Sequence, residues 1–251
     1  MISLKTKNWQ IDDIKTVLLD KDGTFIDLHY FWGKMTELRV KEIIKRFNLE
    51  AGNFRKLCLH LGYDINTGKM LSNGITALYS RSKIIEIFRG NLEEFDVFTT
   101  DEELAEIFDY VSEIFYQDMV KYTKPIESAI EFIKILHRKG VKLGVVTSDS
   151  VVSTELTLRN FDWENLFGVV VGRESSSETK ESGALTKIAL ETLGANPNTT
   201  IMIGDAPMDY ISAKNAGIEN TILVATGQID AVELQQMSDF VVNSLSEIEV
   251  V

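Results

Sequence analysis

Short apolar runs rich in β-branched residues recur through the second half of this chain, and segments with helical periodicity separate them. The runs are Leu143–Thr147, Gly168–Val171, Thr200–Ile203, Thr221–Val224 and Phe240–Val242, and Thr16–Leu19 is an earlier run of the same kind. Unbroken apolar runs are typical of strands covered on both faces, as in a parallel sheet. Between them, residues 126–139 and 182–193 carry apolar residues at helical spacing, and a glycine follows each segment. This alternation predicts a doubly wound α/β core.

Residues 28–122 have a different pattern, because they are rich in helical periodicity and lack comparable apolar runs. We expect helices over 35–47, 75–88 and 101–119, and a short hairpin within 62–71. The pattern predicts two domains: an α/β core formed by 1–27 and 123–251, and a helical insertion formed by 28–122. Since the insertion leaves the core just behind the first strand, it could close over a site at the end of that strand.

Two carboxylates follow the run Thr16–Leu19 in the sequence Asp20-Lys-Asp-Gly-Thr. Side chains at positions i and i+2 of an extended backbone point to the same side, so Asp20 and Asp22 can face one site. Gly23 permits a sharp turn there. In α/β proteins the carboxyl ends of the strands are where ligands bind. The motif therefore predicts an active site in which one carboxylate attacks and the other transfers protons.

A simple turn and a calcium-binding loop are alternative interpretations of this motif. A helix-loop-helix calcium loop that starts at Asp20 would need ligands at its fifth, ninth and twelfth positions. Those positions hold Thr24, Leu28 and Phe31, and the last two have no ligating atom in their side chains. The sequence therefore disfavours the calcium loop.

A second acidic motif follows the run Thr200–Ile203. Gly204 and Asp205 come directly after it, and Asp209 follows four residues later. A helix that begins near Pro207 would place Asp209 in its first turn, where a carboxylate also interacts favourably with the helix dipole. Magnesium prefers a few carboxylates together with water. Asp205 and Asp209 are therefore predicted metal ligands.

Hydroxyl groups follow the run that begins at Leu143. Thr147 could donate a hydrogen bond to a phosphoryl oxygen at the same edge of the sheet, and Ser148 lies next to it. Capping of a helix by Ser148, Asp149 or Ser150 explains the same cluster equally well.

Composition and charge limit the classes of partner. The net charge of −12 argues against a nucleic-acid partner, because phosphate backbones attract basic surfaces. The single cysteine, Cys58, excludes an internal disulfide and is interpreted as a small core residue. The first 15 residues lack the apolar segment of an export signal, and no apolar stretch approaches the ~20 residues that span a bilayer. We expect a cytoplasmic protein with no membrane partner.

Taken in order, Asp20-Lys-Asp-Gly-Thr, Thr147, Lys180 and Gly204-Asp205 with Asp209 resemble the motifs of the haloacid dehalogenase superfamily. The resemblance is greatest to its phosphoglycolate phosphatase-like branch, whose spacing favours Lys180 over Lys187. It implies that residues 28–122 form a mobile helical cap. Ser148, where many members have Asn, and Glu181, where Pro is usual, depart from the pattern.

The resemblance implies a phosphatase that forms an aspartyl-phosphate. Asp20 would be the nucleophile, and Asp22 the acid and base. Mg²⁺ would be held by the Asp20 carboxylate, the Asp22 backbone carbonyl and Asp205, with Asp209 in support. Groups that contact the transferring phosphoryl oxygens would be Thr147 and Lys180, with Ser148 beside them.

The expected substrate is a small phosphorylated metabolite, such as phosphoglycolate or a sugar phosphate, because a closing cap would obstruct a phosphoprotein. A phosphomutase of the same superfamily and a non-catalytic Mg²⁺-binding regulatory module are the alternatives. Phosphonate cleavage would need a Schiff-base lysine, for which Lys34 is a candidate, and dehalogenation would not need Asp22. Candidates for contact with the leaving group are His29, Trp32, Lys34, Arg39, Arg81 and Lys83. The sequence does not indicate an oligomeric state.

Overall fold

The computed structural model describes residues 1–251, and the chain divides into two compact units. Met1–Asp27 and Pro125–Val251 form one unit, and Leu28–Lys124 form the other. The chain leaves and re-enters the first unit at adjacent points, because the Ile126 N–H donates to the Phe25 carbonyl at 2.9 Å. The inserted residues therefore interrupt no strand of the first unit.

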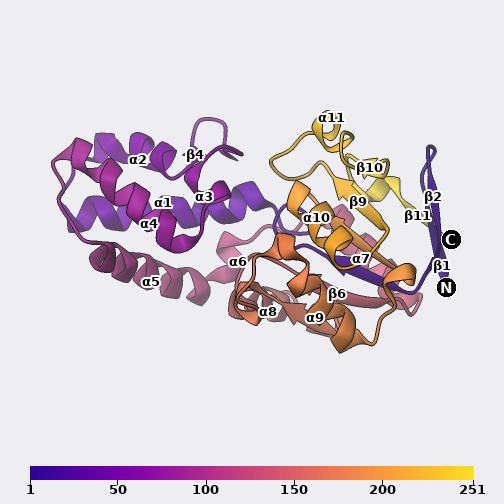
Figure 1. Ribbon diagram of the computed structural model, residues 1–251. Coiled ribbons are helices and arrows are strands. Elements are labelled where there is room, and N and C mark those ends of the chain that lie inside the picture. The colour runs from indigo at the N-terminus through magenta and orange to yellow at the C-terminus, as the bar shows by residue number, and fades with distance from the viewer. The chain divides into compact units, whose positions relative to one another are not determined.

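A six-stranded parallel sheet forms the centre of the first unit (Figure 1). Its order is β10-β9-β8-β3-β6-β7. The strands are β3 (Thr16–Leu19), β6 (Lys142–Val146), β7 (Val169–Val171), β8 (Thr200–Gly204), β9 (Asn220–Val224) and β10 (Val241–Val242). Every apolar run that the sequence marks as a strand lies in this sheet. The predicted doubly wound α/β fold is confirmed.

The order of the strands creates a switch point at β3. The chain passes from β3 to β6 and β7 on one side, and then crosses to β8, β9 and β10 on the other. Residue Leu19 pairs with Val145 of β6 and with Ile203 of β8. The carboxyl ends of three strands therefore meet where α/β proteins bind ligands.

Five α-helices complete the first unit: α7 (Glu127–Arg138), α8 (Val151–Asn160), α9 (Ala184–Leu193), α10 (Pro207–Asn215) and α11 (Ala231–Leu234). The helices predicted over 126–139 and 182–193 correspond to α7 and α9. Gly194 has a φ of 54° at the end of α9, a left-handed conformation that glycine adopts readily. Helix α8 follows the Ser148–Ser150 cluster, as the capping interpretation of that cluster implies, and its N-cap is Ser150, whose side chain accepts from the Ser153 N–H.

The two chain ends form a small antiparallel sheet that the sequence analysis does not anticipate. It contains β1 (Ile2–Lys5), β2 (Gln10–Ile14) and β11 (Glu249–Val250), in the order β11-β1-β2. The Ser3 N–H donates to the Val251 carbonyl at 3.0 Å, and Figure 1 shows both termini beside β1. Strands this short depend on partners from the other end of the chain, which a local pattern does not reveal.

The second unit is helical, with one two-stranded hairpin. Its helices are α1 (Leu28–Arg46), α2 (Phe54–His60), α3 (Ile75–Leu78), α4 (Arg81–Leu92), α5 (Asp101–Gln117) and α6 (Met119–Tyr122), and its strands are β4 (Tyr63–Asp64) and β5 (Lys69–Met70). Buried residues such as Val40, Leu57, Phe88 and Phe108 form its hydrophobic core. The hairpin predicted within 62–71 is confirmed.

Three predicted helix boundaries in this unit are wrong. The first helix starts at Leu28 rather than at residue 35. The helix predicted over 75–88 is two helices, because Tyr79 and Ser80 have extended backbones between α3 and α4. The last helix ends at Gln117, and Asp118 separates it from α6. No helix in either unit combines the length and the apolar character needed to cross a membrane.

Candidate active site

Asp20 lies at the end of the central strand β3. Its backbone N–H donates to the Ile203 carbonyl of β8 at 2.9 Å, which continues the pairing of the sheet by one residue. Only 7% of Asp20 is exposed. Its position is therefore fixed by the sheet rather than by a mobile loop, as a reacting group requires.

Lys180 contacts two of the predicted site carboxylates. It lies in a short 3-10 helix (Lys180–Ser182), and its Nζ donates to Asp20 Oδ1 at 2.6 Å and lies 2.6 Å from Asp209 Oδ1. Burial alone would lower the pKa of this ammonium group, but the carboxylates of Asp20 and Asp209 raise it. Lys180 is therefore positively charged in the site. Lys187, the alternative lysine, is exposed on α9.

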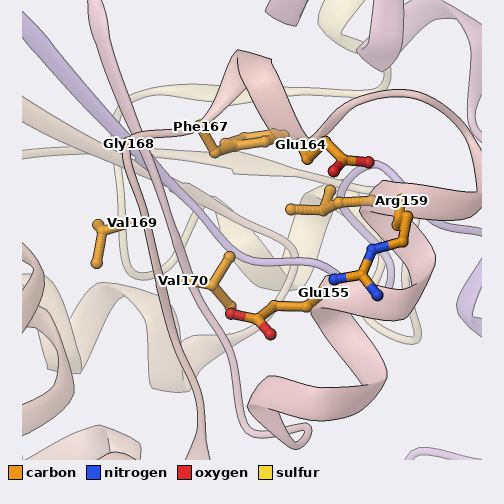
Figure 2. A pocket seen from close by; sticks show the side chains of 8 residues that line it. Glu155, Arg159, Glu164, Phe167, Gly168, Val169 and Val170 are labelled. Atoms are coloured by element: carbon orange, nitrogen blue, oxygen red, sulfur yellow. The ribbon is translucent and has the colours of Figure 1, made fainter.

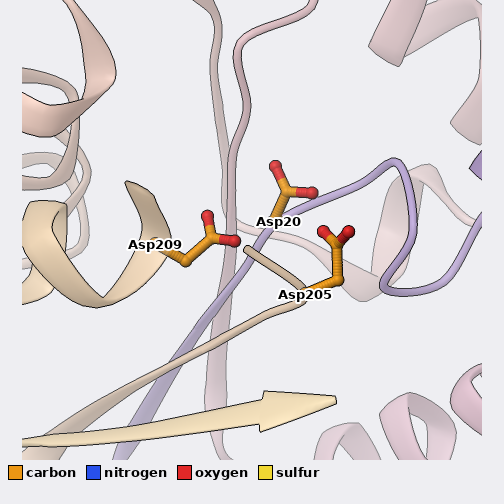
Figure 3. A group of neighbouring side chains, drawn as sticks. All are labelled: Asp20, Asp205 and Asp209. Atoms are coloured by element: carbon orange, nitrogen blue, oxygen red, sulfur yellow. The ribbon is translucent and has the colours of Figure 1, made fainter. Parts of the chain in front are cut away.

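Asp20, Asp205 and Asp209 bring their carboxylates together, with one oxygen of each within 4.8 Å of the others (Figure 3). Burial and the charges of Asp20 and Asp209 raise the pKa of Asp205 well above its ordinary value, although Lys180 opposes this. Burial raises the pKa of Asp209 to about 6, against the lowering effect of Lys180. Three buried acids face one lysine, so a further cation would relieve their repulsion. The donor set suits a hard divalent cation.

Three glycines leave room for these carboxylates. A Cβ atom built on Gly23 or Gly227 would overlap the side chain of Asp205, and one on Gly204 would overlap the side chain of Asp209. Gly23 also has a φ of 90°, which disfavours other residues. The hydroxyl of Thr226 donates to the Gly23 carbonyl at 2.5 Å and ties the loop after β9 to the loop after β3.

The Asp22 carboxylate lies outside the group of three acids and pairs with Lys21. Lys21 Nζ lies 2.6 Å from Asp22 Oδ1 and 3.1 Å from Asp149 Oδ2. Burial raises the pKa of Asp22 to about 6; Lys21 lowers it, while Asp149 and Asp20 raise it. A carboxyl group with this pKa can both donate and accept a proton near neutral pH.

The structure places Thr147 and Ser148 directly after β6, which neighbours β3. Thr147 is buried, and its hydroxyl accepts from the Asp149 N–H at 3.1 Å. Ser148 is exposed, with its Oγ 3.5 Å from the Met208 sulfur. Both residues lie at the edge of the sheet that carries Asp20, and neither belongs to the contact network of Lys180.

Two candidates in the inserted unit have structural partners there. Arg39 is buried, and its guanidinium lies 4.2 Å from the centre of the Phe108 ring. Arg81 donates to Asp109 at 2.7 Å. These contacts explain both arginines without a ligand.

A pocket of about 270 Å³ lies elsewhere in the first unit, between α8 and β7 (Figure 2). Its lining includes Glu155, Arg159, Phe167 and Val169. Phe167 and Val169 lie at the amino end of an edge strand, whereas Asp20 and Asp205 follow the carboxyl ends of β3 and β8. The pocket is therefore separate from the acidic cluster.

A family model described as haloacid dehalogenase-like hydrolase matches residues 69–224. The chain belongs to this family. A phosphoglycolate phosphatase of Aquifex aeolicus is 26% identical over 233 residues, which cover 91% of this hydrolase and 95% of the relative. The pyrophosphatase PpaX of Halalkalibacterium halodurans is 31% identical over 103 residues, 41% of this chain and about half (48%) of that relative. The predicted likeness to the phosphoglycolate phosphatase-like branch is confirmed.

Solved structures of similar fold support the architecture of this hydrolase. A predicted phosphoglycolate phosphatase from Haemophilus somnus has a TM-score of 0.71 and 17% identity, covering 94% of this chain and 97% of that one. A putative β-phosphoglucomutase from Thermotoga maritima has a TM-score of 0.68 and 17% identity, covering 93% and 96%. At these identities the likeness establishes the fold alone.

The roles of Lys21 and Asp149 as a buried pair, and of the glycines beside the acidic cluster, are not predicted from the sequence. A signal for Lys21 is its place two residues behind the buried strand Thr16–Leu19, because a buried lysine needs acidic partners. Asp22 and Asp149 are those partners.

Proposed function

We propose that this hydrolase is a Mg²⁺-dependent phosphatase that cleaves a small phosphomonoester through an aspartyl-phosphate on Asp20. The observation that carries the proposal is the contact of Lys180 with both Asp20 and Asp209 beside Asp205. This arrangement combines a fixed nucleophile, a positive charge for phosphoryl oxygens and carboxylates for a metal. Membership in the hydrolase family and the phosphatase relatives support it.

The residues present fit a magnesium ion. The carboxylates of Asp20, Asp205 and Asp209 would hold it, with the Asp22 backbone carbonyl as a further ligand. When bound, the ion would offset the repulsion between an anionic nucleophile and an anionic substrate. Burial, together with the charges of Asp20 and Asp209, raises the pKa of Asp205 although Lys180 lowers it, so the carboxylate would gain from a further cation beside it.

The chemistry would proceed in two displacements at phosphorus. Asp20 would form a bond to phosphorus as the bond to the leaving oxygen breaks, and Asp22 would give its proton to that oxygen. A water molecule would then attack phosphorus, with its proton passing to Asp22. This step would release inorganic phosphate and restore the Asp20 carboxylate. Lys180 and Thr147 would contact the transferring phosphoryl oxygens, with Ser148 nearby.

The inserted unit, residues 28–124, would act as a cap that limits the substrate to small molecules. Phosphoglycolate and sugar phosphates are the first candidates. Pyrophosphate is a second candidate, because a PpaX relative of Caldanaerobacter subterraneus aligns over 82% of this chain at 27% identity. Pyrophosphate would use the same nucleophile and differ only in its leaving group.

The test is phosphate release from a panel of small phosphomonoesters and pyrophosphate, with and without Mg²⁺, in wild type and Asp20→Asn. We expect release by wild type that depends on Mg²⁺ and is lost in the variant. The ranking of substrates would identify the leaving group. Release of phosphate from no substrate by folded wild type would contradict the proposal and favour a phosphomutase or a non-catalytic role.

A further inference from the structure

Lys21, which stands between Asp20 and Asp22 in the sequence, has a fully buried side chain. The Lys21 side chain is 0% exposed, and its Nζ is shared between Asp22 at 2.6 Å and Asp149 at 3.1 Å. The side chain of Asp149 is itself only 5% exposed. One buried cation therefore joins the ends of two neighbouring strands, β3 and β6.

Asp149 is held firmly by the backbone around it. Its Oδ1 accepts from the Ser150 N–H at 2.7 Å, and its N–H donates to Thr147 Oγ1 at 3.1 Å. Its carbonyl accepts from the Arg173 N–H at 3.0 Å, which ties it to the loop after β7. Asp149 is thus held in place, and its carboxylate can orient the ammonium group of Lys21.

Lys21 is also anchored at its own backbone. Its carbonyl accepts from the N–H groups of Phe25 and Ile26, both at 3.1 Å, within the turn that follows the motif. With its backbone and its ammonium group both fixed, Lys21 holds the Asp22 carboxylate by a short contact. The chain of contacts runs from Asp149 through Lys21 to Asp22.

Stability alone does not require charges at this position. A buried ion pair contributes little net stability, and apolar side chains of similar volume often replace one without loss. The contact of Lys21 with Asp22 at 2.6 Å suggests another role for the charges, namely to orient that carboxylate.

We propose that Lys21 and Asp149 form a buried charge pair that positions the Asp22 carboxylate for proton transfer to the leaving group. This inference rests on the proposed function, in which Asp22 is the acid. Lys21 and Asp149 act through Asp22 and are positioning residues. Without them Asp22 keeps its chemistry but loses its fixed place, and a misplaced proton donor transfers its proton less efficiently.

The test compares two substrates that differ in their need for a proton. p-Nitrophenyl phosphate has a leaving group that departs readily as an anion, whereas an alkyl phosphate depends on an acid. The variant is Lys21→Met/Asp149→Asn, which removes both charges and keeps an acceptor for the Ser150 N–H. Asp22→Asn serves as the benchmark for loss of the acid, and Lys187→Met as a lysine control far from the pair.

We expect the double variant to lose at least about tenfold more kcat/KM on the alkyl phosphate than on p-nitrophenyl phosphate, at a similar melting temperature. A merely structural pair would reduce kcat/KM equally on both substrates, and that result would overturn the inference. If the double variant does not fold, the single variant Asp149→Asn provides the test. We expect it to lose more kcat/KM on the alkyl phosphate than on p-nitrophenyl phosphate, by a smaller factor than the double variant. Equal losses on the two substrates would overturn the inference.

The outcomes also separate this inference from the proposed function. A wild type that cleaves neither substrate would contradict the phosphatase itself. An Asp22→Asn variant with equal losses on both substrates would remove Asp22 as the acid, and the inference with it. An active wild type with a substrate-dependent loss in Asp22→Asn but not in the pair variant would overturn only the role of Lys21 and Asp149.

Discussion

At the scale of single residues, the site depends on the balance between buried acids and buried lysines. Lys180 and Lys21 are each shared between two carboxylates, and in both cases the carboxylates raise the pKa of the ammonium group although burial opposes this. The two lysines serve different acids. Lys180 joins the predicted nucleophile, Asp20, to the predicted metal ligand Asp209, and Lys21 contacts the predicted acid, Asp22.

Asp20→Asn tests the nucleophile. The amide keeps the size of the side chain but cannot form the proposed acyl-phosphate, so we expect kcat to fall by about a thousandfold or more. Phosphate release measures the rate, and circular dichroism checks the fold. Asp12→Asn, at an exposed position of β2, is the control. Near-normal turnover in Asp20→Asn would remove Asp20 from this role.

Lys180→Met tests the charge next to the nucleophile. Loss of the ammonium group removes contacts to Asp20 and Asp209, and we expect kcat/KM to fall about 100-fold or more. Lys187→Met, at an exposed position of α9, should keep its activity. A larger loss in Lys187→Met would assign this role to Lys187 instead of Lys180.

Asp205 provides a pH-dependent test in metal-free protein. The folded-state pKa of Asp205 lies above its unfolded value, so its proton is bound more tightly in the folded state. Stability should therefore fall as pH rises from about 4 through the raised pKa, and then level off. In EDTA, the melting temperature of Asp205→Asn should fall less with rising pH than that of wild type. At pH 8 the variant should therefore melt at a higher temperature than wild type.

Magnesium should reverse the order of the two melting temperatures at pH 8, so that wild type melts higher than Asp205→Asn. Added Mg²⁺ should raise the melting temperature of wild type more than that of Asp205→Asn, because bound metal stabilises the folded state. Equal shifts in the two proteins would exclude Asp205 as a metal ligand.

At the scale of elements, the last residue of β8 determines how closely α10 and its first acid can approach. Helix α10 begins at Pro207, and Asp209 in its first turn accepts from the Ala206 N–H at 3.1 Å. Gly204 leaves the space that the Asp209 side chain fills. The Asp209 side chain at the start of α10 therefore fits against the end of β8 because residue 204 is a glycine.

Gly204→Ala tests this match. The added methyl group would displace the Asp209 carboxylate, and we expect kcat/KM to fall about 10- to 100-fold, with weaker Mg²⁺ dependence. Gly90→Ala is the matched control, because a Cβ there meets nothing within 4 Å. Within helix α4 it should add up to about 1 kcal/mol of stability and leave activity unchanged. Unchanged kinetics in Gly204→Ala would show that Asp209 tolerates displacement.

At the scale of the whole molecule, the core unit is built from two separated stretches of chain. The stretches meet where Ile26 bridges to Pro125 and Ile126 donates to Phe25. The six parallel strands and the acidic cluster all lie in these stretches. The core therefore contains its own sheet and its own predicted metal site.

Replacing residues 28–124 with a short Gly-Ser linker between Asp27 and Pro125 tests this independence. We expect the shortened protein to unfold in one cooperative thermal transition and to be stabilised by Mg²⁺, because no strand is interrupted. The full chain is the reference. Loss of a cooperative transition would show that the core needs the inserted unit to fold.

Local sequence patterns are enough to predict the strands of the main sheet and the acidic and hydroxyl residues that follow them. Strand β3 is fixed by its local pattern, since Val17, Leu18 and Leu19 are apolar, all four strand residues are buried, and an acid follows directly. Local periodicity and burial decide such features, and the order of the motifs along a doubly wound sheet brings Asp20, Thr147 and Asp205 to one edge. The short strands at the two chain ends lacked such a pattern and were missed.

The pairing of the buried charges, in contrast, follows from long-range packing. The sequence does not distinguish a lysine that reaches Asp20 from one that reaches Asp22, because each pairing joins residues brought together by packing. It also does not show that Gly227 clears the space for Asp205, more than twenty residues away along the chain. Backbone pattern is a local property of the chain, whereas the partner of a buried charge is set by long-range register and packing.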